Sequence, residues 1–196
     1  MDEKAKMLAG VMYDATDAKL ARERLRAKDL CHDFNALRPS DIDGKREVLA
    51  QLLGKVDETA EILAPFWCDY GYNIQVGANF FADHNTGVLD GAKVTFGDNV
   101  FVAPNCGFYT AGHPIDVGRR NEGLEYAHPI TVGDNVWIGA GTHVLPGVTI
   151  GNNVVIGAGS VVTRDIPDNT VAYGNPCTVA RPITEADALK PWDRSQ

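Results

Sequence analysis

The sequence predicts a mainly β protein, a solenoid of short parallel strands that follows a small α-helical region. Three observations predict this class. Residues up to about Leu53 show helical spacing of apolar side chains, later residues repeat every six positions, and Gly or Asn interrupts the repeat at regular points. Because six is an even number, the repeating side chains lie on one face of a strand and are buried together.

The helical region is predicted between residues 4 and 53. Leu20, Leu25 and Leu30 recur among charged residues, and Pro39 ends the run because its ring cannot continue a helix. We interpret a basic cluster in this run as a solvated helix face, since acidic residues lie beside it and the whole chain is acidic. We assign this cluster no function. Its members are Lys19, Arg22, Arg24, Arg26 and Lys28.

The six-residue period is clearest toward the C-terminal end. Glycines follow the repeated apolar residues, and Asp-Asn or Asn-Asn pairs supply side chains that tolerate tight corners. The main series is Val132, Ile138, Val144, Ile150, Ile156 and Val162, and the residues two positions before members of it are Ile130, Val136, Val148 and Val154.

An earlier stretch has the same period, with a slip of two residues near Asp90 and Gly91. Since 24 residues, or four periods, separate Phe108 from Val132, residues 110–129 are predicted to leave the solenoid as a loop and rejoin it in phase. Stacked coils share one core, so we expect the N-terminal helices to cover one end. The earlier series is Val76, Ala82, Val88, Phe96, Val102 and Phe108.

Composition excludes several classes of protein. The 196 residues are 44% hydrophobic, enough for one substantial core, and the formal net charge of -8 argues against nucleic acid or an anionic membrane as the main partner. The four cysteines are too scattered for a zinc knuckle or a disulfide scaffold, so we expect reduced packing thiols. No signal-peptide core or membrane-length apolar run is present, which leads us to expect a cytoplasmic protein.

Several segments resemble hexapeptide-repeat acyltransferases, and within them the maltose and galactoside O-acetyltransferase family. The repeat segments are residues 130–139 (ITVGDNVWIG), 146–151 (PGVTIG), 156–163 (IGAGSVVT) and 174–177 (GNPC). Residues 6–10 (KMLAG) and 24–27 (RLRA) resemble the family's N-terminal helical domain, and residues 68–74 (CDYGYNI) resemble the entry to its solenoid.

The resemblance implies a left-handed parallel β-helix, assembled as a homotrimer with active sites between adjacent subunits. The handedness comes from the resemblance alone, because the general rule favours right-handed crossovers. The implied organisation is a helical domain at 1–60, a β-helix at 61–183 and a tail at 184–196. The implied reaction transfers acetyl from acetyl-CoA, without a metal, to a hydroxyl of a sugar such as maltose, glucose or a galactoside.

Acetyl transfer to a hydroxyl needs a general base, and histidine suits that task near neutral pH. His113 lies at the start of the predicted loop, between Gly112 and Pro114, which restrict the backbone on either side. The family's catalytic histidine has the same Gly-His-Pro setting. We therefore predict that His113 takes the hydroxyl proton and later supplies one to the departing thiolate. The other histidines are His32, His84, His128 and His143.

Glu125, near the end of the same loop, has two possible roles. It either orients His113 as a hydrogen-bond acceptor or is a solvated loop carboxylate. The residues alone do not choose between these roles.

The resemblance also places the acetyl-CoA site. Ala140 and Ala158 match positions whose backbone holds the pantetheine arm, and Thr163 and Arg164 lie farther along. Arg181 matches a phosphate-binding arginine, although a neighbouring family arginine is Thr178 in this chain. Arg164 and Arg181 suit phosphates physically because guanidinium groups bind them in a forked geometry. The outward-facing Trp137 is expected to contact either the coenzyme or a neighbouring subunit.

The acceptor site is expected to contain short polar side chains that bind sugar hydroxyls. The candidates lie at or beside family acceptor positions, although aspartates also form turns without any such role. The largest departure is at Asp83, because the family usually has Ala-Asn-Phe where this chain has Ala82-Asp83-His84. The candidates are Asp69, Asp83, Asp90, Asp14 and Asp17.

Three alternatives stay open. A zinc enzyme on the same solenoid, as in γ-class carbonic anhydrases, needs three histidines on whole coils, but His113, His128 and His143 are fifteen rather than eighteen residues apart. A related acetyltransferase for serine, an antibiotic or a nodulation factor is the second, and the N-terminal domain disfavours the first two acceptors. A structural solenoid without activity is the third, and the Gly-His-Pro setting weighs against it.

Overall fold

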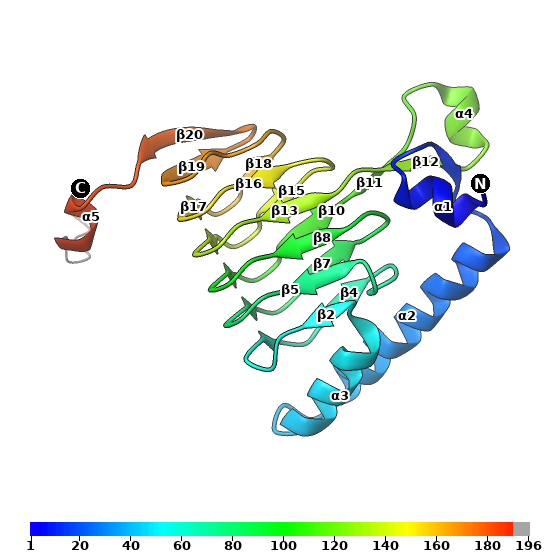
Figure 1. The fold of residues 1–196 in the computed structure, drawn as a ribbon, viewed down its shortest axis with the longest axis horizontal. Coiled ribbons are helices and arrows are strands. Elements are labelled where there is room, and N and C mark those ends of the chain that lie inside the picture. The colour runs from blue at the N-terminus through cyan, green and yellow to red at the C-terminus, as the bar shows by residue number, and fades with distance from the viewer. Residues whose placement is uncertain (190–196) are drawn as a thin grey trace.

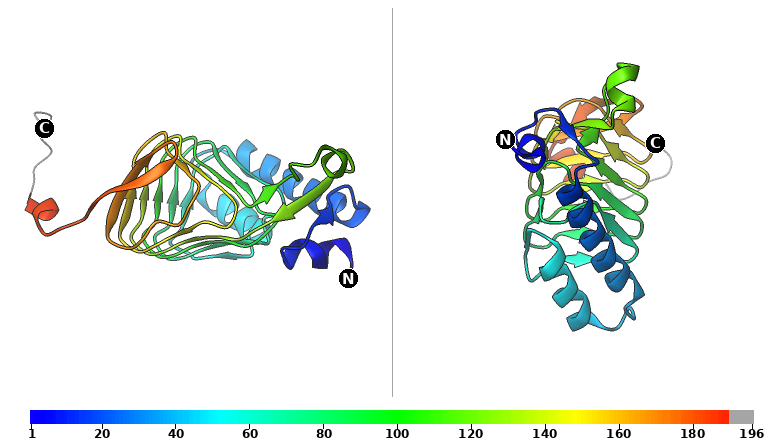
Figure 2. Two further views of the ribbon diagram at one scale, coloured as in Figure 1. Left: turned by 90° about the horizontal axis from the view of Figure 1, so that it is seen from above. Right: turned by 90° about the vertical axis from the view of Figure 1, so that its right-hand side faces the viewer.

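Short parallel strands wind into a three-sided solenoid, and helices occupy its N-terminal end (Figures 1 and 2). The computed structural model describes residues 1–189. The fold is the parallel β-helix that the repeat predicts, left-handed as the resemblance implies, with helices at its N-terminus. The predicted tail at 184–196 lies partly outside the described residues.

The helices fall into three groups. The N-terminal cap contains α1 (Glu3–Leu8), α2 (Ala18–Ala36) and α3 (Ile42–Leu52). The short α4 (Val117–Asn121) lies in the loop that leaves the solenoid. The last element described is α5 (Ala186–Leu189).

Each side of the solenoid is one sheet. We name two of the sheets after their outward-facing side chains and the third after the groove that lies on it. The threonine face consists of β2 (Lys55–Val56), β5 (Ile74–Val76), β8 (Val94–Phe96), β13 (Ile130–Val132) and β16 (Thr149–Ile150). The groove face consists of β4 (Phe66–Cys68), β7 (Thr86–Leu89), β10 (Gly107–Tyr109), β15 (His143–Val144) and β18 (Val161–Val162).

The third side is the aromatic face. It consists of β3 (Glu61–Ile62), β6 (Phe81–Ala82), β9 (Phe101–Val102), β14 (Trp137–Ile138), β17 (Val154–Ile156), β19 (Thr170–Gly174) and β20 (Cys177–Pro182). All pairs on this face are parallel except the last, in which β20 turns back antiparallel on β19. Solenoid strands thus begin at Lys55, slightly before the expected domain boundary at 60/61.

The coils have three lengths, and the two extra residues of the early coils explain the slip in the repeat. Stacked residues are 20 positions apart in the early coils, as for Asn79 and Asn99, and 18 apart later, as for Asp134 and Asn152. In the last coil the separation is 16, as for Asn153 and Asn169. The two extra residues lie where the chain passes from the groove face to the threonine face, which we call the loop corner. Where the loop leaves the solenoid, the separation rises to 36, as between Asp98 and Asp134.

The corner between the threonine and aromatic faces is made by asparagine in five successive coils. Each of these residues has a positive φ, which asparagine tolerates better than most side chains. Their amides also bond from coil to coil, as Asn79 does to Asn99 at 3.0 Å and Asn153 to Asn169 at 2.9 Å. We call this the asparagine corner. Its residues are Asn79, Asn99, Asn135, Asn153 and Asn169.

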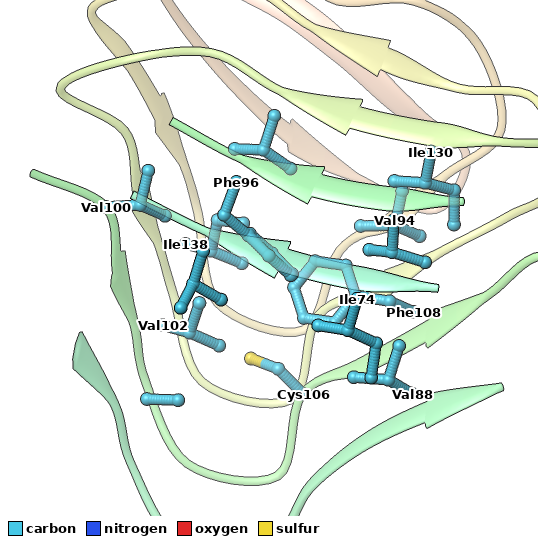
Figure 3. Packing of buried hydrophobic residues seen from close by; sticks show 14 of the residues in the cluster. Ile74, Val88, Val94, Phe96, Val100, Val102, Cys106, Phe108, Ile130 and Ile138 are labelled. Carbon is cyan, nitrogen blue, oxygen red and sulfur yellow. The ribbon is translucent and has the colours of Figure 1, made fainter. Parts of the chain in front are cut away.

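The repeated apolar residues fill the interior of the solenoid (Figure 3). Phe96 packs at a tilt against Phe80, with ring centroids 4.9 Å apart, and meets Phe108 edge-on at the same centroid distance. Fully buried Val and Ile residues from all three faces surround these rings. Since no coil buries its own apolar row alone, the core is continuous along the stack.

The helical cap closes the first coil. Asn35 of α2 accepts from the Phe66 amide at 2.8 Å and donates to the Phe66 carbonyl at 3.0 Å, so it satisfies the open edge of β4. Beneath this contact, the Cys31 and Cys68 sulfurs lie 3.7 Å apart as free thiols. The cap therefore shares its core with the solenoid and covers its N-terminal end.

Candidate active site

The segment predicted as a catalytic loop is a hairpin anchored on the buried Thr110. The Thr110 hydroxyl donates to the Leu89 carbonyl at 2.7 Å and accepts from the Ala92 amide at 2.9 Å. The Thr110 carbonyl accepts from the His128 amide at 2.8 Å, where the chain returns to the solenoid. Between these points β11 (Ala111–Gly112) pairs antiparallel with β12 (Leu124–Ala127), so both ends of the loop rest on the scaffold.

The N-terminal segment adds a third strand to this hairpin. In β1 (Tyr13–Asp14), Tyr13 lies opposite Glu125 and Asp14 lies opposite Leu124 in antiparallel register. The Ala15 amide extends the pairing by donating to the Gly123 carbonyl at 3.3 Å. Figure 1 shows the N-terminal segment beside β12, far along the chain from it.

His113 follows β11 directly, and its side chain is 53% exposed. Its Nδ1 lies 3.2 Å from the Leu124 carbonyl oxygen. Because a carbonyl can only accept, Nδ1 is the protonated nitrogen of the neutral ring in this contact, and Nε2 is then the nitrogen with the free lone pair. The Oε1 atom of Glu125 lies 3.7 Å from Nε2, so the potential base has a carboxylate beside it.

The neighbours of His113 explain the Gly-His-Pro sequence. A Cβ on Gly112 would lie 2.5 Å from the hydroxyl of Tyr126, its cross-strand partner, so only glycine lets this ring cross β11. On the other side Pro114 is buried. His113 therefore lies between a glycine that a tyrosine ring crosses closely and a buried proline.

The carboxyl group of Asp69 interacts electrostatically with Glu125 of the loop. Burial raises the pKa of Asp69, and the cations Lys28 and Arg24 partly offset this increase. The carboxylate of Glu125 raises the pKa of Asp69 further. The structure thus brings a solenoid carboxylate and the carboxylate of Glu125 close enough to influence each other.

Arg24 joins this group, although the sequence did not single it out. It donates from Nη1 to the Tyr70 hydroxyl and from Nη2 to the Ala15 carbonyl, each at 2.7 Å. Its guanidinium also interacts with the charges of Asp69 and Glu125. Arg24 therefore departs from the interpretation of the basic cluster as a solvated face.

Asp90 is fully buried and holds the backbone beneath Asp69. Its carboxylate accepts from the amides of Asp69 at 3.1 Å, Tyr70 at 2.8 Å and Asn73 at 3.3 Å. Burial raises the pKa of Asp90 to about 7, against the lowering effect of these backbone hydrogen bonds. Its carboxylate supports the longer loop corner, where the two extra residues of the early coils lie.

The two N-terminal candidates have different surroundings. Asp17 caps α2 by accepting from the amides of Lys19 and Leu20 at 3.0 and 3.1 Å. Asp14 lies on β1 next to the hairpin, and its carboxylate accepts from the amide and hydroxyl of Thr16 at 2.8 and 2.7 Å. Of the two, Asp14 lies on the strand that pairs with β12 of the hairpin.

A groove of about 500 Å³ adjoins Asp69 on the groove face. Trp67 and Tyr109 are among its walls, and Gly87, whose Cβ position meets no atom within 4 Å, leaves the space between them open. Tyr109 also bonds to His143 Nδ1 at 3.1 Å and stacks on its ring. Aromatic walls with a carboxylate at one end suit a polyhydroxylated ligand.

Asp83 and His84 lie after β6, away from the Asp69 groove. Asp83 borders a second hollow of about 490 Å³, with Phe81, Phe101 and Trp137 of the aromatic face. The Asp83 carboxylate accepts from the His84 amide at 2.7 Å and lies 3.8 Å from the His84 Nε2. His84 Nδ1 contacts the Ala64 carbonyl oxygen.

Ala140 and Ala158 lie on the corner between the aromatic and groove faces, which we call the glycine corner. Two early coils place Asn85 and Asn105 at the positive-φ position of this corner, whereas the two later coils place Gly141 and Gly159 there. Each glycine follows one of the alanines. A Cβ on Gly159 would meet no atom within 4 Å, so the later part of this corner is cleared of side chains.

The other predicted coenzyme residues lie elsewhere on this chain. Thr163 and Arg164 are exposed at the loop corner after β18, across the groove face from Ala158. Arg181 of β20 forms a two-pronged ion pair with Asp187 of α5, at 2.8 and 2.9 Å. Trp137 is 56% exposed on the aromatic face. One chain therefore does not gather these residues into a single pocket.

Two of the histidines considered as zinc ligands have separate partners, since His128 packs at a tilt against Tyr126 and His143 stacks on Tyr109. Within residues 1–189, no three His, Cys, Asp or Glu side chains are grouped to hold a metal ion. Over the same range, none of the helices combines the length and apolar character needed to span a bilayer.

Comparison with known proteins supports the same family along most of the chain. The maltose acetyltransferase hexapeptide capping motif matches residues 6–57, and the bacterial transferase hexapeptide profile of six repeats matches residues 129–164. A provisionally named acetyltransferase of Saccharomyces cerevisiae is 57% identical over 183 residues, which cover 93% of each chain.

Two solved structures share the fold closely. The crystal structure of a maltose O-acetyltransferase from Clostridium difficile is 52% identical with a TM-score of 0.93, and the match covers 94% of this chain and 99% of that one. A galactoside acetyltransferase in complex with coenzyme A is 41% identical with a TM-score of 0.95, covering 99% and 97% respectively.

Proposed function

The chain is an acetyltransferase of the maltose and galactoside O-acetyltransferase family, and from this premise we propose that it transfers acetyl from acetyl-CoA to a sugar hydroxyl, with His113 as general base. The observation that carries the proposal is the contact of His113 Nδ1 with the Leu124 carbonyl at 3.2 Å. This contact holds the exposed ring in the tautomer whose Nε2 accepts a proton.

In the proposed reaction, Nε2 removes the proton of the acceptor hydroxyl as its oxygen attacks the thioester carbonyl. The tetrahedral intermediate then collapses with cleavage of the carbon–sulfur bond. The imidazolium returns its proton to the thiolate, which leaves as free coenzyme A, and the acetyl ester remains on the sugar. The carboxylate of Glu125, 3.7 Å from Nε2, stabilises the imidazolium while it carries this proton.

We propose Asp69, Asp83 and Asp14 as the residues that accept hydrogen bonds from acceptor hydroxyls. Asp69 and the groove beside it lie in the electrostatic neighbourhood of Glu125, and Asp14 lies on the strand that pairs with the hairpin. In this scheme Asp90 acts through its bond to the Asp69 amide, and Asp17 acts as a helix cap.

For acetyl-CoA we propose the glycine corner as the path of the pantetheine arm. Ala140 and Ala158 are exposed there, and the glycines that follow them, Gly141 and Gly159, carry no side chains. Arg164 and Arg181 supply positive charge for the phosphates, with Thr163 as a hydroxyl donor beside Arg164. Trp137, on the aromatic face just before this corner, is proposed to pack against the coenzyme or a second subunit.

We propose a homotrimer in which each active site lies between two subunits. The candidate residues of one chain are divided between the loop corner and the glycine corner, which supports completion of the site by a second copy. The aromatic face also exposes Phe101 and Trp137 by 50% and 56%, which favours its burial between subunits.

An acceptor screen tests the proposed function. Purified protein is mixed with acetyl-CoA and maltose, glucose or a galactoside, and free thiol is followed with a chromogenic disulfide. We expect thiol release that depends on a sugar and disappears in His113→Ala. Parallel wells contain serine, an aminoglycoside and a chitooligosaccharide. Turnover confined to these wells would replace the sugar assignment, and no turnover in any well would contradict the enzymatic one.

A further inference from the structure

A buried tyrosine from the N-terminal segment contacts the catalytic loop. The Tyr13 hydroxyl donates to Glu125 Oε2 at 2.7 Å, joining residues 112 positions apart. The two residues are also cross-strand partners in β1 and β12. The contact is therefore fixed both by backbone pairing and by a side-chain hydrogen bond.

Packing restricts the Tyr13 ring to one position. Its side chain is 1% exposed and belongs to a small core with Met7, Leu20, Ala92 and Ala127. A Cβ on Gly91 would lie 3.3 Å from the Tyr13 hydroxyl, so this glycine leaves room for it. The hydroxyl is thus held at the carboxylate of Glu125 by a rigid ring.

Glu125 by itself is less constrained. Its side chain is 24% exposed, and the bond to Tyr13 is the hydrogen bond that ties Oε2 to the scaffold. When Oε2 is held, Oε1 is directed to within 3.7 Å of His113 Nε2. A freely rotating glutamate would spend part of its time in water, and ordering it at the moment of proton transfer would cost conformational entropy.

The hydroxyl remains a donor under working conditions. Burial and the neighbouring Glu125 both raise the pKa of Tyr13, so the phenol stays protonated. The other charged groups near Glu125 are Arg24 and Asp69. Arg24 donates its hydrogen bonds to the Tyr70 hydroxyl and the Ala15 carbonyl. Among the described residues in contact with Glu125, Tyr13 therefore supplies the side-chain donor.

We propose that Tyr13 is a positioning residue, which holds the Glu125 carboxylate beside Nε2 of His113 and so makes the N-terminal segment part of the catalytic centre. The inference rests on the proposed function of His113 as the base. It predicts that the segment before α2 contributes to catalysis as well as to covering the solenoid. Tyr13 acts through Glu125 and contacts no reacting atom.

Tyr13→Phe isolates the hydroxyl because the ring that packs in the small core is retained. We expect kcat to fall about tenfold, the value of a hydrogen bond to a charged group when it orders a catalytic side chain. The KM for acetyl-CoA and the melting temperature should stay close to those of the wild type. A crystal structure of the variant should show the Glu125 carboxylate displaced from its place 3.7 Å from Nε2.

The matched control is Tyr72→Phe. Tyr72 also donates to a glutamate, at 2.7 Å to Glu23 Oε2. This pair joins the loop corner before β5 to α2, and Glu23 also accepts from Lys4 of α1 instead of facing His113. Tyr72→Phe removes an equivalent bond and should leave kcat within about twofold of the wild type. Equal losses in the two variants would attribute the effect of Tyr13 to general stability and would overturn the proposal.

A double-mutant cycle completes the test. If Tyr13 acts through Glu125, Tyr13→Phe should have little further effect on kcat in a Glu125→Gln background. Independent, multiplying losses would overturn the proposal while leaving His113 as the base. An inactive wild type across the acceptor screen would instead contradict the proposed function itself. If Glu125 keeps its place in the crystal structure of Tyr13→Phe, the positioning role is also wrong.

Discussion

Asn105 and Gly141 occupy the same corner position in successive coils, with φ of 63° and 70°, yet only Asn105 carries a side chain. The equivalent residue is Asn85 in the coil before and Gly159 in the coil after. At the asparagine corner no such change occurs, and asparagine is kept in five successive coils. The change to glycine is therefore not a requirement of the turn, and it coincides with the two alanines proposed to line the pantetheine path.

Gly159→Asn tests this assignment. Asparagine tolerates the positive φ, and the space above Gly159 is open, so the fold should persist. The side chain would project into the proposed pantetheine path, and we expect the KM for acetyl-CoA to rise at least about tenfold, or about 1.4 kcal/mol. Asn153→Gly, at the asparagine corner, is the control and should leave this KM unchanged. Normal coenzyme kinetics in a folded Gly159→Asn would move the pantetheine arm elsewhere.

His113→Ala should leave the fold and the affinity for coenzyme nearly intact. The side chain is exposed, and its protein contacts are the Leu124 carbonyl and the nearby Glu125. We expect kcat to fall by roughly 10² to 10⁴, the usual contribution of a positioned general base. His143→Ala and the exposed His32→Ala serve as controls with little expected effect. Comparable losses from His113→Ala and His143→Ala at unchanged stability would mean that the base has been assigned to the wrong residue.

Asp90 should make stability depend on pH in a direction opposite to that of most carboxylates. Its pKa is about 7 in the folded chain and near 4 when unfolded, so the folded state holds the proton more tightly. The stabilisation is fully present below about pH 4 and is lost as pH rises toward 7. Relative to Asp90→Asn, the wild type should lose at most about 1.4 kcal/mol per pH unit in that window.

Urea unfolding of both proteins between pH 4 and 8 measures this difference. Comparing the two proteins cancels the pH dependence that other carboxylates contribute. One of these is Glu23, whose pKa is lowered by Lys4 and Tyr72 despite its partial burial. A difference between the two proteins that stays constant across the range would show that Asp90 remains ionised within the fold.

The solenoid could be predicted because its signal is local. The even period places the same side chains inward in every coil, and the buried series from Val132 to Val162 follows it without exception. Even the slip near Asp90 was visible, although its cause was not. The structure shows that the two extra residues make a longer loop corner, which packs Tyr70 and Ala92 beneath the N-terminal segment.

The contacts around His113 could not be predicted in the same way. Tyr13 and Glu125 are 112 residues apart on two short strands, and neither strand has a periodic pattern that sets its register. Arg24 did carry a signal, because it lies four residues after Leu20 and three before Ala27, both fully buried on α2. The charge of the basic cluster as a whole does not indicate that position, whereas the helical spacing of its members does.

Assembly is testable through the aromatic face. Sedimentation equilibrium should give three times the chain mass of 21.2 kDa. Phe101→Asp places a charge on the half-exposed aromatic face and should dissociate the trimer with loss of activity, because buried unpaired charge is costly. Thr131→Asp makes the same change on the exposed threonine face and should keep the trimer. A fully active monomer of the wild type would contradict the shared site.

Asp83 offers the sharpest test of acceptor recognition, because the family usually has asparagine at this position. An asparagine can donate to an oxyanion or a sugar oxygen, whereas an ionised aspartate only accepts and would repel a developing negative charge. If Asp83 had kept the oxyanion role, the rate would suffer by about 10² to 10³. We instead propose that it accepts from a sugar hydroxyl while backbone amides serve the oxyanion.

Asp83→Asn should then raise the acceptor KM and keep kcat within about tenfold. His84→Asn, which alters the neighbour 3.8 Å away but leaves the carboxylate, is the matched control. A steep fall of kcat in Asp83→Asn at unchanged acceptor KM would place Asp83 in the chemical step, since only interactions specific to the transition state alter kcat in that way.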